Sequence, residues 1–399
     1  MKTFYDKTLI TLAGANLIHE QFGQKRPIPK NGGKTIEFRR FSRLPKALTP
    51  ITEGVTPAGN KLNVSSVSCT VDQYGDYIEQ TDMLELTSVD NTIVEATKEL
   101  AAQAGLTLDT VVRNELVGGT NVMYSTKFDS KDNEIEVFSR ADISSTSRLK
   151  VKDVFKAAAQ LKAVNAPKIN GSYVAIIHPY VAYDLMQDAN EQWIGIQKYV
   201  DPEKILKGEI GTLGGVRFVE STEAKIFSPN DIIPGVKRAV AVAASGNDKY
   251  IKIADYCETG FVPSSPIPVY VNGEPCNVIR VFVDTSSEEA QANNGRITIL
   301  ELDEKKDFYK GAVICGQGAA GDGSNVFCTL FLGENAYGVT DIEGGGLEHI
   351  VKQKGYGNDP LNQRSSVGWK ATKVAKRLLE EYILRVESGS EFSATAVSN

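Results

Sequence analysis

Few side chains in this sequence are of the types that carry acid–base or metal chemistry. Its 399 residues include only three histidines, His19, His178 and His349, and none has a second histidine at metal-ligand spacing. The cysteines are odd in number and form no Cys-x-x-Cys pair, which argues against a disulfide framework and a zinc site; they are Cys69, Cys257, Cys276, Cys315 and Cys328. The sequence therefore predicts reduced, partly buried thiols, with no metal centre, no catalytic residues and no cofactor.

Two glycine-rich motifs look like nucleotide-binding loops but lack the required context. Residues 33–35, Gly-Lys-Thr, end like a phosphate-binding loop, yet Ile28 stands where that motif needs its first glycine. Residues 316–321, Gly-Gln-Gly-Ala-Ala-Gly, match the dinucleotide-binding pattern, but a strand-like run follows in place of a helix that would face a pyrophosphate. Both are predicted to be turns or flexible loops. A nucleotide-binding enzyme using the Gly316–Gly321 loop is kept only as a weaker alternative.

Charge and hydropathy exclude two further classes of protein. Lysine and arginine total 44 against 50 acidic residues, a net charge of −6, which argues against nucleic-acid binding through a basic surface. No run of about 18 apolar residues exists, so the sequence predicts no membrane span. Thr8, Thr11 and Asn16 interrupt the N-terminal apolar stretch, unlike a secretory signal. We expect the protein to stay in the cytoplasm where it is made.

The strongest strand signals near the N-terminus predict a long β-arm. Residues 34–41 alternate apolar and charged side chains, and a second strand-like run surrounds Val67, Cys69 and Val71. The loop of about 20 residues between them is unusually long for a compact domain, which favours a projecting arm with a contact function.

A basic cluster lies on this predicted arm beside one acidic residue. Its members are Arg39, Arg40, Arg43 and Lys46, and the acidic residue is Glu53. On an isolated strand such charge keeps the edge solvated and blocks aggregation. Alternatively it docks on an acidic neighbouring subunit, where charge complementarity sets partner and register. The length of the arm favours the second interpretation.

Elsewhere the chain alternates helix and strand signals. Apolar periodicity predicts helices at 90–117 and 150–164, and buried strands at 173–177 and 215–220. His178 and Pro179 follow the first of these strands, where we expect His178 to cap the strand end rather than act as a base.

The second half of the chain is predicted to be rich in strands. Six short apolar runs between residues 239 and 315, separated by turn signals, have the spacing of a small β-barrel or sandwich. Residues 372–387 fit either a helix or a strand, and this choice stays open. The polar tail 388–399 is predicted to be flexible.

Several long stretches together resemble one protein family. They are MKTFYDKTLI (1–10), FGQKRPIPKNGGKTIEFRRF (22–41), PKALTPITEGVTPAG (45–59), QYGDYIEQTDMLELT (73–87), LTLDTVVRNELVGGTNVMY (106–124), GENAYGVTDIEG (333–344) and DPLNQRSSVGWKA (359–371). In these segments the chain resembles the N4-type major capsid protein family of tailed bacteriophages, whose members have the HK97-like capsid fold.

The resemblance implies an α+β fold with a set of named parts. In chain order they are an N-terminal arm (1–33), the E-loop β-hairpin (34–80), a peripheral domain (81–149) with a long spine helix (90–117), an axial domain (150–228), a β-rich insertion domain (229–322), a return to the axial and peripheral domains (323–387) and a flexible tail (388–399). The insertion is where this chain departs from the family pattern.

The same resemblance implies a structural function without catalysis. Such a protein self-assembles through pentamers and hexamers into the icosahedral shell of a virion, built in the host bacterial cytoplasm, around double-stranded DNA held without sequence specificity. Its other expected partners are a portal and further capsid or decoration proteins, with no membrane. A protein nanocompartment shell of the same fold is the nearer alternative.

Overall fold

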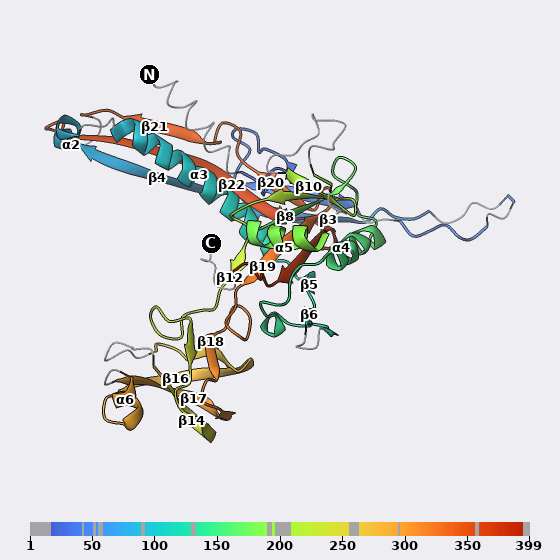
Figure 1. Cartoon of the computed structure of the whole chain (residues 1–399). Coiled ribbons are helices and arrows are strands. Elements are labelled where there is room, and N and C mark those ends of the chain that lie inside the picture. The colour runs from blue at the N-terminus through green and yellow to red at the C-terminus, as the bar shows by residue number, and fades with distance from the viewer. Residues whose placement is uncertain are drawn as a thin grey trace. The chain divides into compact units, whose positions relative to one another are not determined.

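The computed structural model describes residues 17–41, 44–50, 53–54, 59–88, 92–128, 133–189, 194–195, 209–254, 263–293, 296–355 and 359–393. The chain divides into two compact units (Figure 1). Unit 1 comprises Met1–Gly119 and Gly333–Ile383, and unit 2 comprises Thr120–Leu332 and Leu384–Asn399.

Unit 1 is built on a sheet whose central strand comes from near the end of the chain. The sheet runs β1-β20-β22-β21, and β4 pairs antiparallel with the N-terminal part of β22. The strands are β1 (Gln24–Lys25), β4 (Asp72–Thr81), β20 (Tyr337–Thr340), β21 (Glu348–Lys352) and β22 (Arg364–Arg377).

The long helix α3 (Thr92–Val117) packs against β22, as Figure 1 shows. Leu100, Ala101, Ala104 and Leu108 recur at helical spacing and form a buried cluster with Trp369 and its neighbours on β22. The short helix α2 (Asp82–Thr87) follows β4, and the Thr81 hydroxyl accepts a hydrogen bond from the Leu84 N–H at its start. A 3₁₀ turn, η5 (Glu380–Tyr382), follows β22.

The predicted β-arm is present as a hairpin of β2 (Thr35–Phe41) and β3 (Val64–Thr70), paired antiparallel from Thr35 opposite Thr70 to Phe41 opposite Val64. These two strands form a sheet of their own. Phe38 is buried at the base, where its ring lies so close to Gly338 that a Cβ there would approach it to 2.5 Å.

Unit 2 contains an eight-stranded sheet ordered β5-β23-β19-β8-β11-β10-β9, with β12 paired to β19. Its central strand β8 is wholly buried, as the continuous apolar run Tyr-Val-Ala-Ile-Ile requires. The strands are β5 (Val122–Tyr124), β8 (Tyr173–Ile177), β9 (Ile194–Gly195), β10 (Glu209–Leu213), β11 (Val216–Glu220), β12 (Ile226–Phe227), β19 (Val326–Leu332) and β23 (Ile383–Ser388).

The remaining elements of this part of unit 2 include two helices, α4 (Val151–Ala163) and α5 (Pro179–Ala189). A short hairpin pairs β6 (Lys127–Phe128) with β7 (Glu134–Ile135), and a 3₁₀ turn, η1 (Arg140–Asp142), follows it.

All six strands predicted between 239 and 315 are present and form one sheet, ordered β13-β18-β15-β16-β17-β14. A bridge between Ala241 and Ile253 joins its two outer strands, and the Val242 N–H donates to the Lys252 carbonyl at 2.9 Å. The sheet therefore closes into a barrel. Its elements are β13 (Arg238–Val240), β14 (Ser245–Ile253), β15 (Ile267–Val271), β16 (Glu274–Asp284), α6 (Glu288–Ala292), β17 (Ile297–Phe308) and β18 (Val313–Gly316).

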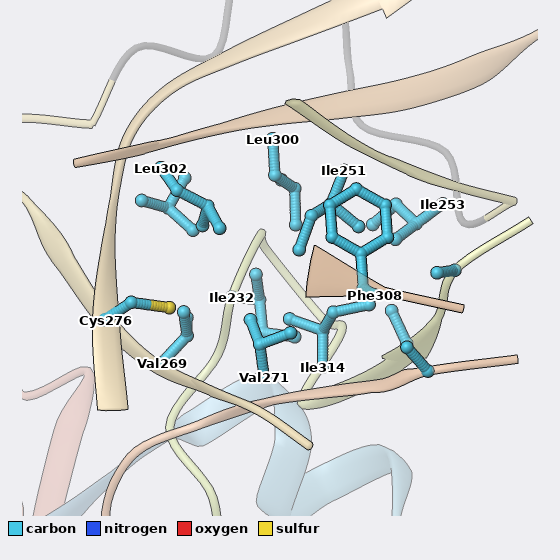
Figure 2. Packing of buried hydrophobic residues seen from close by; sticks show 14 of the residues in the cluster. Ile232, Ile251, Ile253, Val269, Val271, Cys276, Leu300, Leu302, Phe308 and Ile314 are labelled. Carbon is cyan, nitrogen blue, oxygen red and sulfur yellow. The ribbon is translucent and has the colours of Figure 1, made fainter. Parts of the chain in front are cut away.

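The barrel has its own hydrophobic core. Figure 2 shows side chains from every wall pointing toward one another, including Ile251, Leu300, Phe308 and Ile314. Ile232, from the segment that enters the barrel, lies among them with no surface exposed. Strand alternation explains this packing, because every second side chain of each strand points inward.

The structure also answers or corrects several expectations. Residues 372–387 are strand in β22 and β23 with the short turn η5 between them. Residues 120–149, predicted to belong to the peripheral domain, group with unit 2, because β5 pairs in parallel with β23. Ser388 and Ser390 of the predicted tail are buried, and the Ser390 hydroxyl donates to Asp184. Residues 394–399 lie outside the described residues.

Candidate assembly surfaces

The charged residues predicted to contact other subunits lie on the β2–β3 hairpin and its connecting loop. The Arg39 guanidinium, 70% exposed, lies 3.8 Å from the carboxylate of Glu37 on the same strand. Arg40, Lys46 and Glu53 are also exposed. Arg43 lies outside the described residues. The structure thus leaves the described members of the cluster in solvent and does not pair Lys46 with Glu53.

Sequence reasoning missed the apolar side chains of the same loop. Leu44, Leu48 and Leu62 are 53%, 81% and 59% exposed, and Val64 at the start of β3 is 52% exposed. Where such exposed side chains form one contiguous patch, they mark a contact surface, so this loop is a candidate. The available signal was the pair of leucines within the polar, proline-punctuated stretch that joins the two strands.

A second exposed apolar set lies at α2. Met83, Leu84 and Leu86 are 62%, 47% and 76% exposed, and Leu361 in a neighbouring loop is 74% exposed. The Asp82 N–H donates to the Gln363 carbonyl at 2.9 Å, which joins the start of the helix to that loop. We call α2 together with residues 359–363 the α2 end of unit 1.

The strand leading to the α2 end is acidic. Asp76, Glu79 and Asp82 lie along β4 and its junction with α2, and Glu79 pairs with Arg364 at 3.4 Å. Hydrogen bonds from the Gln103 side chain and then from the Tyr77 N–H hold the pKa of Asp76 below its ordinary value. This carboxylate is therefore negatively charged at neutral pH.

A groove lies on the sheet beside this acidic strand. It has a volume of about 540 Å³ and is lined by residues of β4, β21 and β22. Two glycines form part of its floor, and a Cβ at Gly368 would lie 2.8 Å from the Cβ of Tyr77. Trp369 and Ile350 add apolar lining, and Asp76 and Lys352 add one charge of each sign, so the groove can accept an apolar side chain beside a charged one.

Residues 17–33, the described part of the predicted N-terminal arm, pack within unit 1. His19 is completely buried, and its Nδ1 lies 2.6 Å from the Asp109 carboxylate on α3. The second Asp109 oxygen accepts hydrogen bonds from the N–H groups of Ile18 and His19. Lys373 pairs with Glu20 at 2.7 Å in the same region. His19 is therefore a buried structural residue, a role that its isolated place in the sequence did not reveal.

The Gly316–Gly321 motif is a close-packed connection between the barrel and the eight-stranded sheet. A Cβ at Gly316 would lie 1.9 Å from the Asn230 carbonyl, and one at Gly321 would lie 2.8 Å from the Ala141 carbonyl. Gly318 has a φ of 124°, which favours glycine. The motif is glycine-rich for packing reasons, and β19 follows it, so no helix faces a phosphate.

Arg140 binds the Gly316–Gly321 loop to the end of the chain's last strand, β23. Its guanidinium donates to both carboxylate oxygens of the buried Glu387, at 2.6 and 2.8 Å, and to the Gly318 carbonyl at 3.3 Å. It also stacks 3.5 Å from the Phe227 ring. Burial opposes the charged form, but the hydrogen bonds to Glu387 together with the negative charge of Glu387 outweigh it, so the pKa of Arg140 is raised.

The other candidate reactive groups are structural. His178 stands at the N-terminus of α5, where its Nδ1 accepts from the Tyr180 N–H at 3.2 Å, and burial lowers its pKa to about 4. Burial raises the pKa of Cys276 to about 12 and of Cys315 to about 11, so neither is a reactive thiolate. Among the residues that the structure describes, no group of three potential ligands could hold a metal ion and no helix is long and apolar enough to span a membrane.

A family model described as phage capsid protein matches residues 108–358, more than half of the chain. The chain belongs to the phage capsid protein family. A comparison with curated proteins found no match.

Solved phage capsids share the fold of this capsid protein. The capsid of Ralstonia phage GP4 is similar with a TM-score of 0.54 and 13% identity, covering 92% of this chain and 87% of that chain. The capsid of cyanophage P-SCSP1u has a TM-score of 0.52 and 12% identity, covering 94% and 88%. The α+β HK97-like fold is thereby confirmed.

Family and fold together establish this as a major capsid protein, the repeated subunit of a phage shell and a component of the virion. Such a subunit must bind other copies of itself through different surfaces. The hairpin and the α2 end of unit 1 both expose apolar side chains to solvent.

Proposed function

We propose that this capsid protein assembles through pentamers and hexamers into an icosahedral shell enclosing the double-stranded DNA of a tailed phage. The observation that carries the proposal is the β2–β3 hairpin, whose loop exposes leucines that nothing in the described part of its own chain covers. Heterologous contacts between copies can close into rings, and this favours extended elements such as the hairpin over a compact surface.

In this proposal the hairpin, within residues 34–80, is an E-loop that lies across the adjacent subunit. Arg39, Arg40, Arg43 and Lys46 meet carboxylates of that subunit, and Glu53 meets a cation. The acidic strand β4 is a suitable acceptor, and the groove beside it offers space for an apolar side chain. Charge complementarity of this kind sets register and association rate more than affinity.

The remaining parts follow the same assignment. Residues 1–33 are the N-terminal arm, unit 1 supplies the peripheral domain, and the eight-stranded sheet of unit 2 supplies the axial domain. Residues 229–322 are an insertion domain carried by the axial domain. The self-contained core of the barrel supports this, since an insertion must bury its own apolar surface.

The partners are proposed on the same basis. The shell forms in the host bacterial cytoplasm, joins a portal and other capsid or decoration proteins, and performs no catalysis. A net charge of −6 suits a container for DNA, because a strongly basic wall would bind phosphates along the packaged strand.

The test is expression of the full chain followed by electron microscopy. Closed shells of uniform size with pentameric and hexameric units support the proposal, and persistent monomers under all assembly conditions contradict it. In virions, nuclease-protected double-stranded DNA supports the phage assignment. Shells that contain a protein cargo and no DNA would favour the nanocompartment alternative.

The role of the insertion is tested separately. Replacing residues 229–322 by a short linker should leave shells intact if the barrel only decorates them. Loss of closed shells in this variant, with a folded subunit by circular dichroism, would show that the barrel takes part in assembly.

A further inference from the structure

The outer wall of the barrel carries a row of side chains that point away from its core, and two of them, Arg280 and Phe282, are exposed. Val281 and Val283 of β16 pack against the core, so the alternating residues Arg280, Phe282 and Asp284 point outward. Phe282 is 43% exposed. Aromatic residues and arginine are enriched at the centres of protein interfaces.

Neighbouring strands extend this row. Phe282 lies opposite Ile299 of β17, and Arg280 lies opposite Glu301. Glu301 in turn lies opposite Tyr250 of β14, which is 46% exposed. We call these outward residues of β14, β16 and β17 the outer β16 face.

One charge on this face has no partner. The Arg280 side chain is exposed and makes no hydrogen bond or ion pair within the part of the chain that the structure describes. In contrast, Lys252 at the border of the face pairs with Glu289 of α6 at 3.1 Å. An exposed arginine that forms no ion pair within the described part of the chain, beside an exposed phenylalanine, is suited to an intermolecular contact.

We propose that the outer β16 face is a contact between the barrels of two copies of this chain, related by a two-fold axis through Phe282. Along β16 the outward residues run from a cation, Arg280, through Phe282 to an anion, Asp284. When a second copy of the strand runs in the opposite direction, its anion faces the cation of the first copy, and its cation faces the anion. The two-fold axis places each Arg280 against the partner copy's carboxylate at the same strand position as Asp284, with the two phenylalanine rings between the ion pairs. This contact rests on the proposed function, because it needs a shell.

The acidic half of the pair is suited to this task. Asp284 accepts hydrogen bonds from the Ser286 N–H and hydroxyl, both at 2.9 Å, which fix the position of its carboxylate. These bonds, with those from Ser287, lower its pKa to about 2. The carboxylate therefore stays charged at neutral pH. An arginine opposite it can form a charge-assisted hydrogen bond with this anion.

Because the outer β16 face is small, the contact is expected in assembled shells and not between free subunits. It offers fewer than ten side chains, whereas a stable interface uses about 20–30 residues from each partner. Free subunits should therefore not dimerise through it. In a shell the copies are held near one another, and the high effective concentration allows a small contact to form.

The experiment compares shells of the wild-type chain with those of Arg280→Glu by cryo-electron microscopy. Arg280→Glu places a second carboxylate opposite Glu301 of the same chain, so thermal unfolding of the free variant must first show that the subunit fold is kept, and Arg280→Gln, which adds no carboxylate, should also lose the pairing. We expect wild-type shells to show paired barrels meeting at Phe282. Arg280→Glu sets like charges against each other, so barrel pairing should be lost and shells should disrupt at a lower temperature.

Phe282→Leu is the matched control, since it keeps an apolar side chain and should retain the pairing. Wild-type shells in which this face is open to solvent, covered by its own chain or occupied by another protein would overturn the contact alone. Pairing that survives Arg280→Glu would also overturn it. Wild-type protein that forms no shells would overturn both this contact and the proposed function.

Discussion

The β2–β3 hairpin and the barrel are both antiparallel β structures, but they bury very different amounts of apolar surface. The barrel closes on itself and encloses a cluster of 15 buried side chains. The described hairpin strands bury only Phe38 and Cys69, and the joining loop leaves three leucines exposed. The difference predicts that the barrel is stable by itself, whereas the hairpin, under the proposed function, gains its burial from another subunit.

The largest effect is expected at the tip of the hairpin. Leu48→Asp should abolish closed shells, because a carboxylate replaces the most exposed leucine of the loop at a surface that must become buried. Size-exclusion chromatography and microscopy measure this loss. Leu48→Met is the control and should still assemble. Normal shells from Leu48→Asp would show that the loop does not need a neighbour.

Core truncation should separate the two regions in the free subunit. Ile314→Ala removes a fully buried side chain of the barrel and should cost about 2–5 kcal/mol of unfolding free energy. Ile36→Ala in the partly exposed hairpin should cost under about 1 kcal/mol. Chemical denaturation of unassembled protein measures both. Equal losses of unfolding free energy in the two variants would contradict the proposal that the barrel is stable by itself and the hairpin is not.

The connection of the barrel should depend on one buried ion pair. Arg140→Ala leaves the fully buried Glu387 with Arg385 alone, 2.9 Å away, and should destabilise unit 2 by about 3 kcal/mol. Hydrogen exchange should rise at 316–321 before it rises in the barrel strands. Arg148→Ala, which breaks a more exposed pair with Glu391, is the control and should cost under about 1 kcal/mol.

The smallest effect is expected from the hairpin charges. Arg40→Gln removes an exposed cation and should change subunit stability by less than about 0.5 kcal/mol. It should slow assembly at low salt, because the hairpin charges steer docking. Light-scattering kinetics at two salt concentrations measure this. Unchanged assembly kinetics would indicate that Arg40 only keeps the strand surface solvated and does not steer docking.

The sequence predicted the secondary structure well wherever periodicity was regular. The alternation in residues 34–41, the periodicity toward Val117 and all six barrel strands correspond to elements of the structure. For residues 372–387 the sequence did not decide between helix and strand. Near Thr372, β22 buries every second side chain, as a strand does. The spacing of the larger apolar residues in this segment, however, also fits a helix. Only pairing with β4 and β20, far away in sequence, decides for a strand.

The contact surfaces were harder to predict, for physical reasons. The basic cluster was visible because charge can be read from residue type alone. The exposure of Leu44, Leu48 and Met83 depends on what the rest of the chain fails to cover, and no local pattern records that. The burial of His19 likewise follows from its meeting with Asp109, 90 residues away.

The most direct measurement is a cryo-electron microscopy map of the assembled shell at side-chain resolution. The account predicts that the hairpin of each subunit lies on unit 1 of another subunit, with Leu48 buried there and Arg39 or Arg40 beside a carboxylate of that subunit. A map in which the hairpin packs on its own chain, or stands in solvent with Leu48 exposed, would contradict it.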